Sequence, residues 1–210
     1  MQAMTITVTR GGLHRSDMYR RRWMMFVDGE NLVMRAQELM NLRNVTLTEG
    51  SHYRRDVFVW LPRLAPTSAS VAQPVAGPLL EDWAIRAYYY TSLVGDDSRL
   101  GEVRTALRLL GFQPVVFKTS RSQRASKGVD ITLTKDMLVH AFNNNYDAAV
   151  LVTGDGDYVP VVEELKRMGK SVYLLFFEDP GAGLNDQLRL ACDKFFRLTT
   201  PFTGRWSGGA

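Results

Sequence analysis

Two short acidic turns stand out among the residues that could do chemistry. Asp28 follows an apolar run and opens the sequence Asp-Gly-Glu-Asn, whereas Asp155 and Asp157 alternate with glycine in Gly-Asp-Gly-Asp. Their carboxylate oxygens are hard ligands of the kind that suit Mg²⁺ or Mn²⁺. A single Asp between a strand and a helix is commonly a helix cap, and that alternative stays open for each position alone. Two carboxylates two residues apart repel each other, so a cation bridging Asp155 and Asp157 is the simpler interpretation.

Asp130 is the third candidate ligand, and it follows the sequence Lys-Gly-Val near the expected beginning of a helix. The helix dipole favours an Asp in a first helical turn, which gives Asp130 a purely structural alternative. Because this helix leads into the strand before Asp155, its N-terminus is expected at the same edge of the sheet. Softer metals would recruit histidines. The three histidines lack ligand spacing and are expected on the surface or in the core: His14, His52 and His140.

An alternation of strands and helices would position these turns. Apolar runs of strand length occur at residues 23–27, 85–90, 113–117, 148–153 and 171–176. Helical spacing of apolar residues occurs between them, at residues 32–40, 98–110, 129–142 and 159–168. Strands that alternate with helices predict an α/β fold with a doubly wound, mostly parallel sheet and helices on both faces. Ligands collect beyond the carboxyl ends of such strands, which is where Asp28 and Asp155 are expected.

The chain of 210 residues, 45% of them apolar, is long enough for one α/β domain with an insertion. Residues 1–22 lack apolar periodicity and are interpreted as a flexible N-terminal arm, and residues 199–210 as a C-terminal tail. The domain between them spans residues 23–198. Residues 41–80 contain a possible short strand at 57–60, followed by a Pro-rich stretch that cannot form a regular helix or central strand. This segment is therefore interpreted as an insertion or long loop.

Charge and cysteine content narrow the classes of partner and compartment. The net charge of +4 and the pI of about 9.3 leave room for a polyanionic partner. The single cysteine, Cys192, cannot form an internal disulfide, and no Cys/His spacing typical of a zinc site occurs. A reducing, cytoplasmic environment is therefore expected. No apolar stretch approaches the roughly 20 residues of a membrane-spanning helix, so no membrane partner is predicted.

A basic segment lies between the strand at 113–117 and Asp130. Its side chains could hold phosphates by charge, which would make RNA the partner. The alternative is an ordinary solvated loop. The residues concerned are Lys118, Arg121, Arg124 and Lys127.

Three segments, in this order, resemble the signatures of the NYN domain family, relatives of the PIN nucleases. They are FVDGEN at residues 26–31, KGVDI at 127–131 and VTGDGDY at 152–158. The resemblance covers about residues 23–198. It implies a PIN-like α/β fold and an Asp cluster that binds Mg²⁺ or Mn²⁺ for the hydrolysis of RNA phosphodiesters.

The resemblance also assigns roles to individual residues. It makes Asn31 a polar partner that orients Asp28 or a metal-bound water, and Thr153 a hydroxyl near the phosphate. The long segment 41–80 departs from the compact family pattern, so it bears on substrate shape and access. It is also where a protein partner or a second copy of the chain would contact this domain. The residues implied to bind metal and to be catalytic are Asp28, Asp130, Asp155 and Asp157.

Three functions therefore compete. The leading hypothesis is a metal-dependent ribonuclease, an endonuclease, in which no side-chain nucleophile is needed because bound divalent ions activate water and offset phosphate charge. The first alternative is a catalytically inactive module that keeps the fold and binds RNA or a protein. The second is a phosphatase or phosphotransferase with Asp28 as nucleophile, for which Glu30 stands where a second Asp is usual. Metal-dependent cleavage that is lost on Asp155→Asn separates the first two hypotheses, and trapping of a phosphorylated Asp28 would support the third.

Overall fold

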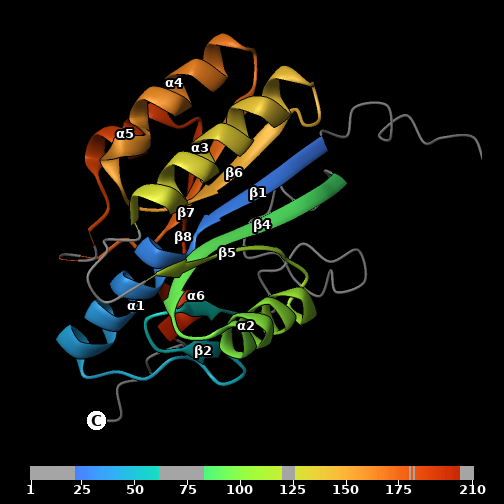
Figure 1. Ribbon diagram of the computed structural model, residues 1–210. Helices are drawn as coiled ribbons and strands as arrows, with labels where there is room; N and C mark the ends of the chain where they lie inside the picture. The colour runs from blue at the N-terminus through green and yellow to red at the C-terminus, as the bar shows by residue number, and fades with distance from the viewer. Residues whose placement is uncertain (1–21, 62–82, 120–125, 180, 182, 204–210) are drawn as a thin grey trace, which may run out of the picture.

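Six parallel strands form one sheet in the order β5-β4-β1-β6-β7-β8 (Figure 1). The computed structural model describes residues 22–61, 83–119, 126–179, 181 and 183–203. The predictions for the N-terminal arm and for the Pro-rich stretch fall outside these residues. The strands are β1 (Arg22–Asp28), β4 (Trp83–Val94), β5 (Gln113–Thr119), β6 (Ala148–Val152), β7 (Ser171–Phe176) and β8 (Lys194–Arg197). The predicted doubly wound α/β sheet is confirmed, and every pairing within it is parallel.

Helices cover both faces of this sheet (Figure 1). On one face, α1 (Gly29–Arg43), α2 (Asp97–Leu109) and α6 (Thr199–Thr203) contribute to one apolar cluster. On the other face, α3 (Ser126–Phe142), α4 (Val159–Arg167) and α5 (Asp186–Ala191) contribute to a second cluster. Side chains alternate along β1, so Met25 and Val27 join the first cluster while Met24 and Phe26 join the second. Because both faces are buried, the strands are the continuous apolar runs seen in the sequence.

Part of the segment assigned to an insertion belongs to the core. An antiparallel pair, β2 (His52–Arg54) and β3 (Phe58–Trp60), follows α1. The backbone N–H of Val59 donates to the Tyr89 hydroxyl at 3.1 Å, and that hydroxyl donates to the Val59 carbonyl at 3.2 Å. The Trp60 ring lies edge-on to Phe112 and to Phe202, with centroids 4.9 and 6.3 Å apart. The buried Phe202 belongs to α6, so residues 199–203, which were assigned to the tail, also pack on the core.

Two glycines end helices where the sequence predicts an end. Gly111 follows α2 with φ of 89°, and Gly169 follows α4 with φ of 76°. This left-handed conformation is easiest for glycine, which is why helices so often stop there. Among the helices of the described residues, none is both long and apolar enough to cross a membrane.

Candidate active site

The two acidic turns meet at the carboxyl edge of the sheet, between neighbouring strands. Asp28 is the last residue of β1, and Val27 pairs with Val152 at the end of β6, so the turn that starts at Thr153 lies beside Asp28. The chain then leaves β1 toward α1 on one face and leaves β6 toward α4 on the other. A change of face between adjacent parallel strands opens a crevice, and this is where α/β proteins bind ligands.

Asp28 is held in place by both turns. It is 2% exposed, and its Oδ1 accepts the backbone N–H of Asn31 at 3.0 Å, which caps α1. Its Oδ2 accepts the Thr153 hydroxyl at 3.0 Å. The Asn31 side-chain oxygen accepts the backbone N–H of Gly154 at 2.9 Å, so this residue links the two turns. The Thr153 side chain is fully buried, and its hydroxyl lies against Asp28.

Burial changes the protonation of Asp28. Loss of water around the carboxylate raises its pKa to about 7, and the negative charges of Asp130 and Glu30 act in the same direction. The hydrogen bonds from Asn31 and Thr153 oppose this shift. A carboxylate that resists ionisation at neutral pH in this way gains stability from any cation that comes near it.

Asp130 lies in α3, on the face of the sheet opposite to α1, and contributes to the same acidic cluster. The Tyr158 hydroxyl donates to its Oδ1 at 3.2 Å. Burial raises the pKa of Asp130, and the charges of Asp155 and Asp157 raise it further. The helix-dipole alternative for Asp130 is wrong, because α3 begins at Ser126 and its first turn holds no acidic residue. Asp130 therefore lies beyond the positions that the dipole favours.

Asp155 does serve as a cap, as the structural alternative predicts. Its Oδ1 accepts the backbone N–H of Asp157 at 3.0 Å, at the start of the 3₁₀ helix η4 (Gly156–Tyr158). The Asp157 side chain has no part in this cap. Its carboxylate still lies close enough to raise the pKa of Asp130, so its charge belongs to the same cluster.

Glu30 is a member of the site that sequence reasoning missed. Its Oε1 is buried without a hydrogen-bond partner, while the Ser92 hydroxyl bonds to its carboxylate. Burial raises the pKa of Glu30, and the charge of Asp130 adds to the shift. A signal was present, since Asp28-Gly29-Glu30 repeats the acid-glycine-acid pattern of the other turn.

The donor set fits a divalent cation in its chemistry. Every candidate ligand is an oxygen, and burial together with mutual repulsion disfavours the ionised form of Asp28, Glu30 and Asp130. A buried Glu30 oxygen also lacks a partner. Within the part of the chain that the structure describes, no three His, Cys, Asp or Glu side chains form a ready-made metal shell. A cation would therefore complete its shell with water or substrate oxygens, as Mg²⁺ commonly does.

Two glycines let the turns approach the sheet closely. A Cβ on Gly29 would lie 2.1 Å from the Tyr89 ring and 2.6 Å from the Tyr90 carbonyl oxygen. A Cβ on Gly154 would lie 2.2 Å from the Phe176 ring and 2.7 Å from the Gly183 carbonyl oxygen. Backbone atoms cannot move aside as a flexible side chain can, so both positions require glycine.

Substitution of Gly154 by Ala is therefore expected to destabilise the fold by about 1–3 kcal/mol, the usual cost of overpacking. Gly101 provides the matched control, because it lies in α2 with open space around its Cβ position. Gly101→Ala should instead raise stability by about 0.5–1 kcal/mol through helix propensity. Urea unfolding of both variants measures the difference. Equal effects of the two substitutions would show that the turn at Gly154 tolerates a side chain.

The basic residues are not arranged as one loop. Lys118 belongs to β5, and its Nζ pairs with Asp97 Oδ1 at 2.9 Å. Lys127 lies in the first turn of α3, because this helix begins three residues before its predicted start at 129. Residues 120–125 are outside the described part of the chain, so Arg121 and Arg124 remain predictions.

The parallel doubly wound sheet, with the two acidic turns at the ends of the neighbouring strands β1 and β6, is an α/β fold of the PIN-like kind. The NYN domain family model matches residues 22–199, and the chain belongs to this family, as the three motifs predicted. Among solved structures, the chain resembles a protein of unknown function from Vibrio parahaemolyticus, with a TM-score of 0.56 and 18% identity. The match covers 87% of this chain and 96% of that one and concerns the fold alone. No curated protein matches the chain.

Proposed function

We propose that this protein is a metal-dependent ribonuclease that hydrolyses RNA phosphodiesters at the acidic edge of its sheet. The observation that carries the proposal is the buried Asp28, whose pKa of about 7 reflects burial and the neighbouring charges of Asp130 and Glu30. Such a cluster costs stability unless a cation compensates it. Membership of the NYN domain family supports a nuclease. The side chains that would hold Mg²⁺ or Mn²⁺ are Asp28, Asp130, Asp155 and Asp157, with Glu30 as an added member.

A bound divalent cation would supply a Lewis acid for the phosphate and would lower the pKa of water. Hydrogen bonds from neighbouring residues orient the carboxylates that would bind this cation. Thr153 and Asn31 fix both oxygens of Asp28, and Tyr158 fixes Oδ1 of Asp130. The Tyr158 hydroxyl stays protonated, since burial first and the nearby carboxylates second raise its pKa far above neutrality. It therefore remains a hydrogen-bond donor at every pH where the site works.

Side-chain nucleophiles fit this site poorly. Burial raises the pKa of the Cys192 thiol to about 12, so no thiolate is available at neutral pH. Asp28 is 2% exposed and each of its oxygens accepts a hydrogen bond, which is a poor position for direct attack on a phosphorus atom. This argues against the phosphotransferase alternative, which requires Asp28 as nucleophile.

The test is incubation of the purified chain with a mixed pool of RNA and single-stranded DNA in Mn²⁺, in Mg²⁺ or in EDTA. We expect RNA to be cut in the presence of either metal and to stay intact in EDTA. A protein that binds RNA without cutting it under any of these conditions would be the inactive module. Trapping of a phosphorylated Asp28 would instead support the phosphotransferase.

The basic segment provides a separate prediction about RNA. If Arg121 and Arg124 bind phosphates, replacing both by Ala should weaken the binding of RNA by the same factor whatever the RNA sequence. Each lost phosphate contact should lower the slope of log affinity against log salt by about 0.7. Fluorescence anisotropy over a salt series measures this slope, and Mn²⁺ binding serves as the control that should not change. An unchanged slope in the double variant would make the segment an ordinary surface.

A further inference from the structure

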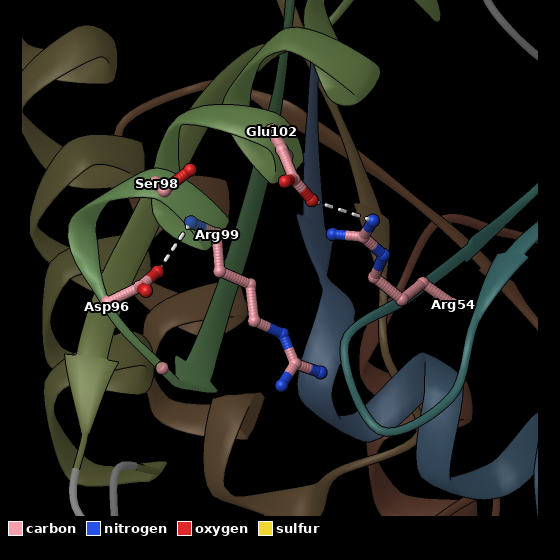
Figure 2. A pocket seen from close by; sticks show the side chains of 6 residues that line it. Arg54, Asp96, Ser98, Arg99 and Glu102 are labelled. Carbon is pink, nitrogen blue, oxygen red and sulfur yellow. Dashed lines mark hydrogen bonds and ion pairs between the residues drawn. The ribbon is translucent and has the colours of Figure 1, made fainter.

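A polar pocket of about 520 Å³ lies where β4 passes into α2 (Figure 2). Its volume falls within the range of sites that hold small organic groups. The pocket is lined by one residue of β2 and by the first part of α2 with the turn before it. These residues are Arg54, Gly95, Asp96, Ser98, Arg99 and Glu102.

The pocket adjoins the acidic site along β4. The Ser92 hydroxyl bonds to the Glu30 carboxylate, and Gly95 lines the pocket three residues further on. At about 3.3 Å per strand residue, the two features are separated by roughly 10 Å. A nucleic-acid strand lying across the acidic site would therefore bring a neighbouring nucleotide to this pocket, and the inference rests on the proposed function in this respect.

Two arginines in the lining of the pocket have donors without a partner. Within the described residues, the Arg99 guanidinium forms neither a hydrogen bond nor an ion pair. Arg54 Nη2 pairs with Glu102 Oε2 at 3.2 Å, but Arg54 Nη1 is buried without a partner. Figure 2 shows Arg99 extending from the start of α2 toward the β2–β3 turn, and Arg54 extending from the opposite side toward α2. A bound acceptor would satisfy the Arg99 guanidinium.

Carboxylates bring unused acceptors to the same space. Asp96 caps α2, with its Oδ1 accepting the Arg99 backbone N–H at 2.9 Å, and Glu102 uses one oxygen for Arg54. The second oxygen of each carboxylate accepts no hydrogen bond from the described residues. Two guanidinium groups and two carboxylates leave the lining formally neutral, so a phosphate would meet as much repulsion as attraction. A neutral group that carries donors beside acceptors matches this lining better.

We propose that the pocket binds a guanine base of the RNA substrate next to the cleavage site. Guanine offers O6 and N7 as a pair of acceptors that a guanidinium fork can contact together. On its Watson–Crick edge it also offers an N–H and an amino group, side by side, to a carboxylate. Adenine, cytosine and uracil lack this pair of adjacent donors. Arg99 would bind the acceptor edge, and Glu102 or Asp96 the donor edge.

Sequencing of the ends produced from a random RNA pool tests the proposal. The full chain is compared with Arg99→Ala, Glu102→Gln and the control Arg108→Ala, an exposed residue of the same helix outside the pocket. We expect guanine to be enriched at one fixed position beside the cut for the wild type and the control. Arg99→Ala should reduce this enrichment about tenfold while cleaving the pool, and Glu102→Gln should reduce it too. Enrichment of another base, or enrichment unchanged by Arg99→Ala, would overturn the proposal.

A second measurement is independent of cleavage. Calorimetric titration with guanosine monophosphate and adenosine monophosphate should show tighter binding of the guanine nucleotide by the wild type. This discrimination should disappear in Arg99→Ala at an unchanged melting temperature. If the wild type cuts no RNA, the proposed function fails and this titration alone decides the pocket. Cleavage without guanine preference, together with equal binding of the two nucleotides, overturns the pocket and leaves the proposed function intact.

Discussion

Replacement of Asp155 by Asn is expected to reduce RNA cleavage by about 10²–10⁴-fold. A bound metal ion stabilises the transition state by several kcal/mol, and the loss of one charged ligand weakens this stabilisation. Each 1.36 kcal/mol of activation free energy corresponds to about a factor of ten in rate. The fold should survive, because the Asn side-chain oxygen can still accept the Asp157 backbone N–H that Asp155 Oδ1 binds in the native turn. Single-turnover cleavage of RNA in Mn²⁺ gives the rate.

Glu163→Gln is the matched control, since Glu163 is an exposed carboxylate on α4. It should leave the rate unchanged. An Asp155→Asn rate within about twofold of the wild type would show that the charge of Asp155 has no part in catalysis. Unfolding of Asp155→Asn would mark this residue as a structural cap instead.

In EDTA, the protein is expected to lose stability as the pH rises from about 4 to about 7. The folded-state pKa of Asp28 is about 7, against about 3.9 for an unfolded Asp, so the folded state holds this proton more tightly. Stability from protonated Asp28 is thus fully present below pH 4 and is lost as the pH passes through 7. The difference of about three pKa units corresponds to at most about 4 kcal/mol.

Asp28→Asn isolates this effect, because Asn has nearly the same shape and does not ionise. Urea unfolding at pH 5 and pH 8 should give the variant a smaller loss of stability than the wild type. At pH 8, Mn²⁺ should stabilise the wild type and should have little effect on the variant. Parallel pH dependence of the two proteins would contradict the proposed desolvation of Asp28.

The sequence predicts the inner strands well because their composition reflects burial on both faces. Residues 171–176 are one example, since the predicted and observed limits of β7 agree. β8 was not predicted, because Lys194 and Arg197 bound only two aromatic residues and the strand pairs with β7 alone. β2 gave no signal either, since it has three residues that are largely exposed. Short edge strands depend on tertiary contacts that no local pattern contains.

The sequence likewise predicts some residues of the candidate site and not others. Asp28 ends β1 and Asp155 follows β6, so a parallel sheet alone predicts that both lie at its carboxyl edge. The contributions of Glu30 and Tyr158 depend on which oxygen is buried and which hydroxyl reaches Asp130, and no spacing contains that information. The apolar periodicity places the start of α3 three residues too late, so it predicts Asp130 at a helix terminus that Asp130 does not occupy.

Titration of the metal-free protein with Mn²⁺, followed by electron paramagnetic resonance of the free ion, tests directly whether the carboxylate cluster binds a divalent cation. We predict saturable binding to the wild type and to Glu163→Gln. Binding should be weakened at least about tenfold in Asp155→Asn and in Asp130→Asn, since each variant removes one charged oxygen ligand. A wild type without saturable binding, or the same Mn²⁺ affinity in all four proteins, would contradict a cation site at these carboxylates.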